Sequence, residues 1–166
     1  MRVLKRQDGF TLLELILAMA VAAIVMLAIG TVLTSHAAMT KDAYSRAAVQ
    51  TELQICADAL IEMIKPLPEK TDFYHTAGTN DYLFESDTVT VVISFFETEN
   101  RLEASYYSDS VLLRNRDYTN IHSFTVTENR AGNGTLSGVK ILLTADSNGK
   151  LITLETDVGL RNNRGL

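Results

Sequence analysis

The most pronounced pattern in the chain is a run of apolar residues close to its start. From Leu15 to Leu33, nineteen consecutive residues carry no charge, and only Gly30 and Thr31 among them are neither strongly apolar nor alanine. As a helix, the run would be roughly 28 Å long at about 1.5 Å per residue. That length is close to the ~30 Å hydrocarbon thickness of a bilayer. The pattern therefore predicts a membrane-spanning helix.

Beyond Leu33 the sequence becomes polar but remains compatible with a helix. Neither glycine nor proline occurs between Thr31 and Lys65. Apolar residues recur there at steps of three and four, as on one face of a helix; they are Val49, Leu53, Cys56, Leu60, Met63 and Ile64. Pro66 and Pro68 then end the helix, because proline lacks an amide proton and clashes with the preceding turn. We expect one helix from about residue 11 to about residue 65, apolar all round in its first half and striped in its second.

From Asp72 onward the apolar residues alternate with polar ones, which is typical of half-buried strands. The expected strands cover residues 88–96, 101–107, 110–114, 121–127, 138–144 and 150–156. A turn is expected at residues 97–100 and a tight hairpin at Asn148-Gly149. We predict an α+β fold in which the second half of the helix packs on one face of an antiparallel sheet of five or six strands. Residues 129–134 are expected to form a loop and residues 157–166 a polar tail.

Charge is segregated along the chain in a way that orients it across a membrane. Residues 1–9 contain Arg2, Lys5 and Arg6 against Asp8, a net charge of +2, and the whole chain has −5, which leaves −7 for the remainder. A basic flank before an apolar span predicts an N-terminus kept in the cytoplasm. The acidic remainder would face outward, and it lacks the basic stripe that nucleic-acid binding requires. The total of 166 residues suits one domain plus an anchor.

The side chains that commonly carry chemistry are few and scattered. The single cysteine, Cys56, cannot form an intramolecular disulfide, and its position on the striped helix predicts a buried apolar role. No pair among His36, His75 and His122 has metal-ligand spacing. Nucleotide-binding and nucleophile-elbow motifs are missing from the sequence as well. We therefore expect no cofactor, no metal site and no enzymatic activity.

The residues before the apolar span form a recognisable constellation. A short basic leader ends at Gly9, and Phe10, Thr11 and Glu14 follow before the uninterrupted apolar run. This arrangement resembles the processing site of the type IV prepilin and type II secretion pseudopilin superfamily. The resemblance implies cleavage between Gly9 and Phe10 by a prepilin peptidase on the cytoplasmic side, followed by N-methylation of Phe10. It also implies that Thr11 and Glu14 act in assembly. Gly9 has no side chain, which lets a protease approach its backbone closely.

Glu14 is the costliest residue of this constellation. A charged carboxylate costs about 2.5–3.5 kcal/mol at the centre of a bilayer and less near its edge. The helix macrodipole returns only about 0.3–1 kcal/mol to an anion in the first turn. The resemblance suggests a further cation, the free Phe10 amine of a neighbouring subunit. A simpler alternative, in which Glu14 is an ordinary flanking charge at the headgroup level, stays open.

These inferences divide the chain into four segments and imply a set of partners. The segments are a prepilin leader (1–9), a transmembrane and assembly helix (10–33), its amphipathic continuation (34–65) and an extracytoplasmic β-rich head (66–166). The resemblance implies that the partners are other pilin or pseudopilin subunits, the prepilin peptidase, the cytoplasmic membrane and an assembly platform protein. The filament so formed would serve secretion, DNA uptake (competence), adhesion or motility.

The order of elements in the head is also similar to that of J-type minor pseudopilins, PilW-type minor pilins and competence pseudopilins. The similarity rests on the Leu112-Leu-Arg114 segment, the strand containing Phe124, the hairpin after it and residues 158–162. It favours a minor over a major subunit.

Two other classes of protein fit parts of the sequence. A secreted protein could be cleaved after Ser35-His-Ala37, a small-x-small site, although the apolar run exceeds the usual signal-peptide core of roughly 7–15 residues. A monomeric, bitopic binding protein would keep Met1. The mature N-terminus separates the three classes: Phe10 for a prepilin, Ala38 for a secreted protein and Met1 for a bitopic protein.

Overall fold

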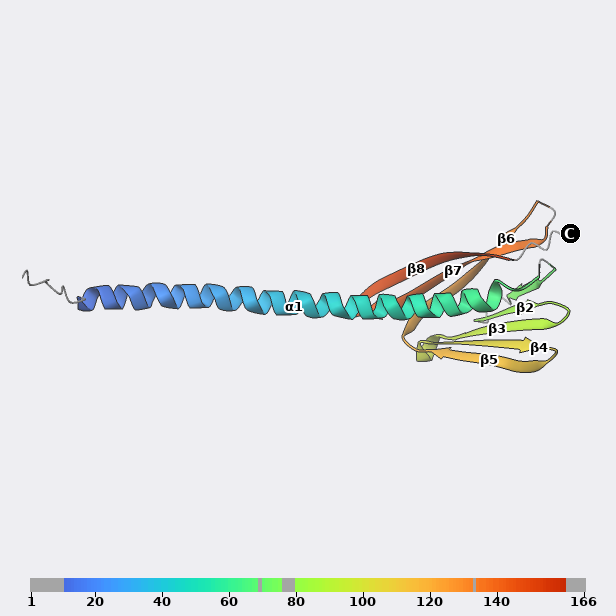
Figure 1. Ribbon diagram of the computed structural model, residues 1–166, viewed down its shortest axis with the longest axis horizontal. Coiled ribbons are helices and arrows are strands. Elements are labelled where there is room, and N and C mark those ends of the chain that lie inside the picture. Colours follow the sequence, from blue (N-terminus) through green and yellow to red (C-terminus); the bar gives the residue numbers. More distant parts are fainter. Residues whose placement is uncertain (1–10, 69, 76–79, 133, 161–166) are drawn as a thin grey trace, which may run out of the picture. The chain divides into compact units, whose positions relative to one another are not determined.

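The computed structural model describes residues 11–68, 70–75, 80–132 and 134–160. The chain divides into two compact units, residues 1–43 and 44–166. The long helix α1 (Leu12–Ile64) contributes its first part to one unit and its second part to the other (Figure 1). The sequence-based bounds of this helix, about 11 to 65, are confirmed to within one residue at each end.

The first part of α1 is a helix whose side chains are exposed in the part of the chain that the structure describes. Every side chain from Leu12 to Lys41 is exposed. Alanine and leucine are its commonest residues, and both favour helix strongly. The hydroxyl groups of Thr31 and Thr34 donate to the carbonyls of Ala28 (2.8 Å) and Gly30 (3.1 Å), so the helix itself satisfies these two hydroxyls. By length and composition, α1 could cross a membrane, since its most apolar 18-residue window has a mean hydropathy of 2.8 and is unburied.

The second part of α1 carries the predicted apolar stripe, and the structure buries it. The stripe residues, joined by Ala57, are Val49, Leu53, Cys56, Leu60, Met63 and Ile64, and each is at most 8% exposed. The last helical hydrogen bonds run from the Lys65 amide to the Ile61 carbonyl and from the Leu67 amide to the Ile64 carbonyl. The two prolines that follow stop the helix, as predicted.

The described part of the head contains eight strands in two antiparallel sheets. One sheet has the order β1-β2-β3-β4-β5, with bounds Asp72–His75, Asp81–Glu85, Val89–Phe96, Arg101–Ser108 and Val111–Tyr118. The other has the order β6-β7-β8, with bounds Ile121–Arg130, Leu136–Ser147 and Lys150–Gly159. The short 3-10 helix η1 (Glu97–Glu99) forms the predicted turn between β3 and β4. The α+β class is confirmed.

The predicted strand count and the single sheet are wrong. β1 and β2 have only four and five residues, too few for their alternation to stand out from the loops around them. The division into two sheets depends on which strands pair across the fold, and local alternation carries no information about that. The predicted polar tail is also wrong in part, because β8 continues to Gly159 and Leu160 is buried.

Both sheets and the helix stripe share one hydrophobic core. Its largest fully buried side chains include Leu53 and Leu60 from α1, Phe84 from β2, and Leu143 from β7. Between the two sheets, Tyr82 and Phe124 meet edge to face with their ring centroids 5.1 Å apart. The helix therefore packs on two sheets rather than on one.

Tight turns and one close approach fix the registers of the hairpins. The β7–β8 turn has positive φ at Asn148 (54°) and Gly149 (77°), the geometry of the predicted two-residue hairpin. The β4–β5 turn uses Asp109 and Ser110 in the same way. Gly138 lies so close to β8 that a Cβ atom there would be 2.6 Å from the carbonyl oxygen of Val158. Only glycine fits at that position without a shift of the backbone.

The single thiol of the chain is enclosed in this core. Cys56 is free and fully buried, as predicted. Burial raises the pKa of its thiol to about 12, because the thiolate would lose its hydration.

Candidate functional site

The start of α1 brings together the two predicted assembly residues. The Glu14 carboxylate oxygen Oε2 accepts hydrogen bonds from the backbone amide and from the hydroxyl of Thr11, each 3.0 Å long. The Glu14 amide in turn donates to Thr11 Oγ1 at 3.3 Å. Thr11 thus stands at the N-cap of the helix and Glu14 three residues later. This reciprocal arrangement is a capping box, which satisfies two amide donors that the first helical turn leaves unpaired.

The capping box is the feature of this site that we did not predict. The signal was present, since Thr11-Leu-Leu-Glu14 has the Thr-x-x-Glu spacing of the motif. Capping residues of this kind contribute about 0.5–2 kcal/mol to a helix. Glu14 therefore has a local role in the helix in addition to any role between chains. Among the described residues, both hydrogen bonds that its carboxylate accepts end on Oε2.

The other two predicted site residues, Gly9 and Phe10, lie outside the described residues. Phe10 is bonded directly to Thr11 in the sequence. Cleavage after Gly9 would therefore create a free amine only one residue before the N-cap. A carboxylate, an amine and the positive end of a helix dipole would then occupy the same short segment.

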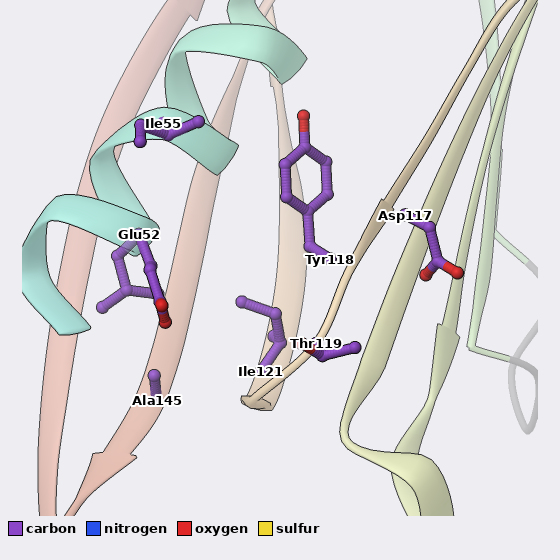
Figure 2. A pocket seen from close by; sticks show the side chains of 8 residues that line it. Glu52, Ile55, Asp117, Tyr118, Thr119, Ile121 and Ala145 are labelled. Carbon is purple, nitrogen blue, oxygen red and sulfur yellow. The ribbon is translucent and has the colours of Figure 1, made fainter. Parts of the chain in front are cut away.

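The head contains a small cleft between α1, the end of β5 and the sheet that includes β7. Figure 2 shows its lining, with the Tyr118 ring beside the helix and Glu52 on the facing turn. Its volume of about 200 Å³ is below the roughly 300 Å³ at which small-molecule pockets begin. Burial raises the pKa of the Tyr118 phenol. The lining residues are Glu52, Leu53, Ile55, Asp117, Tyr118, Thr119, Ile121 and Ala145.

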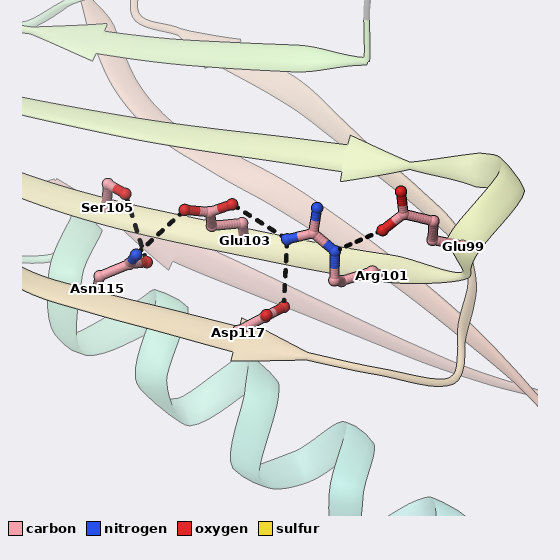
Figure 3. Close-up of polar contacts among 6 residues, drawn as sticks. All are labelled: Glu99, Arg101, Glu103, Ser105, Asn115 and Asp117. Carbon is pink, nitrogen blue, oxygen red and sulfur yellow. Dashed lines mark hydrogen bonds and ion pairs between the residues drawn. The ribbon is translucent and has the colours of Figure 1, made fainter.

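A polar network covers the outer surface where η1, β4 and β5 meet. Arg101 forms ion pairs with Glu99 (2.9 Å), Glu103 (3.1 Å) and Asp117 (3.6 Å) (Figure 3). Its guanidinium also lies 4.0 Å from the ring centroid of Phe96. The hydrogen bond with Glu99 and the other two carboxylates raise the pKa of Arg101. The Arg101 guanidinium thus links β4 with β5 and η1, so the network has a structural role.

Among the residues that the structure describes, no three histidine, cysteine or acidic side chains are grouped closely enough to hold a metal ion.

Comparison with known proteins identifies the class of the N-terminal segment. Residues 4–30 match the family of the prokaryotic N-terminal methylation motif. The comparisons with curated proteins and with solved structures give no match. A long apolar helix followed by antiparallel sheets is the layout of a pilin-like protein. The motif indicates a type IV prepilin-like precursor, structural in character, that a prepilin peptidase processes. The long apolar helix fits a single-pass membrane anchor.

Proposed function

We propose that the chain is a subunit, of minor type, of a type IV pilus-like or type II pseudopilus filament. The methylation motif at residues 4–30, continuous with the unpacked apolar part of α1, is the observation that carries this proposal. An unburied helix of this composition needs a bilayer or other apolar helices around it. A filament core built from such helices supplies the second environment, after the membrane has supplied the first.

In this proposal the chain passes through three states. The leader (1–9) holds the N-terminus in the cytoplasm, and residues 10–33 span the cytoplasmic membrane with the head (66–166) outside. A prepilin peptidase then cuts between Gly9 and Phe10, and the Phe10 amine is methylated. Finally, an assembly platform protein draws the subunit among other pilin or pseudopilin subunits, where the segment 10–33 joins the filament core. The segment 34–65 connects this core to the head.

The position of Ser35–Ala37 supports this proposal over a cleaved signal peptide. These residues lie inside α1, which continues without a break to Ile64. A cut after Ala37 would remove the apolar part and divide a continuous helix ahead of the buried stripe, which begins at Val49. A prepilin-type cut keeps the helix whole.

The mature N-terminus tests the proposal directly. We expect intact-mass analysis of the membrane-extracted chain to show loss of residues 1–9 and addition of one methyl group. Gly9→Val should leave the leader in place, because the added side chain obstructs the protease, whereas Gly30→Val serves as a control with the same change away from the site. A chain that retains Met1 or begins at Ala38 would refute the proposal.

Glu14 tests whether assembly depends on charge between chains or on the cap within a chain. Glu14→Gln removes the charge and keeps an oxygen able to accept the Thr11 hydrogen bonds, whereas Thr11→Ala keeps the charge and removes the hydroxyl. We expect both variants to be inserted and processed, and only Glu14→Gln to be lost from sheared filaments, because a neighbour's Phe10 amine requires a carboxylate. Loss of Thr11→Ala alone would instead assign Glu14 to the cap.

A further inference from the structure

The tight turn between β7 and β8 combines a demanding backbone geometry with a reactive pair of residues. The turn consists of Asn148 and Gly149, and the strand pair Ser147–Lys150 closes it. A two-residue turn of this kind requires positive φ at both positions, and both residues have it. Asn-Gly meets that requirement best, because glycine tolerates positive φ without strain. In the same dipeptide, no side chain on the second residue shields the asparagine from the backbone nitrogen that follows it.

An asparagine followed by glycine can lose its side-chain amide without an enzyme. A base in the solvent first takes the proton of the Gly149 amide, and the nitrogen then attacks Cγ of Asn148. The new N–Cγ bond forms, the Cγ–Nδ2 bond breaks, and ammonia leaves with the proton that the base returns. The cyclic succinimide so formed takes up water and opens to aspartate or to isoaspartate. The net reaction consumes one water molecule, releases one ammonia molecule and involves no oxidation.

An acidic side chain is bonded to the nitrogen that would attack. The Gly149 amide donates a hydrogen bond to Oδ1 of Asp146, and the N···O distance is 2.7 Å. This is a short hydrogen bond of the charge-assisted kind. The carboxylate stabilises the protonated amide and repels the amide anion that the attack requires, since two negative charges at this distance repel each other. The first step of the reaction should therefore be slow while this hydrogen bond is in place.

The strands around the turn oppose the reaction as well. Ring closure requires a rotation about the Cα–C bond of Asn148, which brings the Gly149 nitrogen to Cγ. The ladder of β7 and β8 restrains that rotation, because its last pair joins Ser147 to Lys150 directly across the turn. Ser147 is itself fixed, since it is only 2% exposed and its Oγ lies 3.1 Å from Oγ of Ser45 on α1. The turn must therefore open before the ring can close.

We propose that Asn148 is a site of spontaneous deamidation, and that the Asp146 carboxylate protects it by holding the Gly149 amide in its protonated form. This inference is independent of the proposed function. Asn148 and Asp146 are both exposed, so water and base reach the site as soon as the turn opens.

The two products would change the hairpin in different ways. Aspartate at position 148 places a second carboxylate close to Asp146. Isoaspartate adds a methylene group to the backbone of a two-residue turn, which breaks the register of the pair that closes it. Either product should weaken the position of Ser147 against Ser45, so deamidated chains should hold α1 less firmly.

Peptide mapping of the full-length chain in detergent tests the protection. The chain is kept at mildly alkaline pH, and the fractions of aspartate and isoaspartate at position 148 are followed by mass and by chromatography. We expect Asn148 to react at least about tenfold more slowly in the folded chain than in urea, because a hydrogen bond to a charged group is worth about that factor. Equal rates in the two conditions would overturn the proposal.

Substitution of the carboxylate tests its role. Asp146→Ala should raise the rate at Asn148 about tenfold. Asp157→Ala, which removes another exposed carboxylate of the same sheet, should leave it unchanged. A second Asn-Gly pair in the chain, Asn133-Gly134, supplies an internal reference, so each rate is expressed relative to the rate at position 133.

A further variant separates the charge from the fold. Asp146→Asn keeps an oxygen that can accept the Gly149 hydrogen bond but lacks the charge, and we expect a rate between those of the wild type and Asp146→Ala. If Asp146→Ala fails to fold, the comparison of Asp146→Asn with the wild type decides the question in its place. An unchanged rate in the folded variants would overturn the proposal. A lower rate would also overturn it, because the carboxylate would then be the base that assists the attack.

Discussion

The two parts of α1 differ in how far their side chains are buried. Both are continuous helix without proline, yet in the first part every side chain from Leu12 to Lys41 is exposed, while in the second part seven apolar residues are buried. Apolar composition is therefore a poor guide to burial along this chain. Among the described residues, the most apolar segment is exposed, and a more polar segment supplies buried side chains to the core.

The difference shows that the two parts of α1 meet different requirements. The second part is specified by position, since a stripe at steps of three and four must match the inner faces of two sheets. The first part is specified by composition, because a bilayer accepts any apolar side chain at any angle around the helix. Substitutions should therefore act by position in one part and by polarity in the other.

The largest expected effect follows from an aspartate on the buried stripe. Leu53→Asp or Leu60→Asp places an unpaired carboxylate at a site with 0% exposure, which costs several kcal/mol and should unfold the head. Thermal unfolding of the full-length chain in detergent, followed by the near-ultraviolet signal of its tyrosines, measures this loss.

Two matched aspartates on the same helix should behave differently. Ile55→Asp, at a site that is 58% exposed, should leave the melting curve almost unchanged. Ile24→Asp should also leave the head intact, but it should reduce membrane insertion, since an aspartate deep in a span costs about 2.5–3.5 kcal/mol. Carbonate extraction of membranes measures the inserted fraction. If Ile55→Asp unfolded the head as Leu53→Asp does, position would not decide the outcome in this part of α1.

Substitutions of two glycines, one in the head and one in the first part of α1, should have smaller effects on stability. Gly138→Ala places a methyl group against the Val158 backbone and should destabilise the head by about 1–3 kcal/mol. Gly30→Ala meets nothing within 4 Å and should favour helix by up to about 1 kcal/mol. The melting temperature of the head should fall with the first change and stay constant with the second. A fall with Gly30→Ala would show that the two parts of the helix are coupled.

Most local features of the fold were predictable from the sequence. The bounds of α1, its buried stripe, the Asn148-Gly149 hairpin and the six longer strands follow from periodicity, proline and turn residues. The prepilin-like class of the N-terminal segment is a local signal too, and the family match at residues 4–30 agrees with it. These signals lie within short segments, so a single sequence contains them in full.

What could not be predicted depends on distant contacts or on competing local ones. The two sheets exist because β5 is followed by β6 without pairing with it, which no alternation pattern reveals. The burial of Leu160 requires contact with the rest of the core, although the residues around it are polar. The Thr11–Glu14 cap was missed for another reason, because the cost of the Glu14 charge suggested a distant partner when a local one was available.

The enclosure of Cys56 has a consequence for the life of the protein outside the cytoplasm, where the head is proposed to lie. Thiol–disulfide exchange requires a thiolate, so a thiol with a pKa of about 12 stays inert while the head is folded. The same thiol has a pKa of 9.0 when it is not buried, so unfolded chains lose its proton first and the head loses stability as pH rises from about 9 to about 12. In an oxidising compartment, a covalent dimer linked through Cys56 would therefore form only from molecules whose heads had unfolded, and it would persist afterwards.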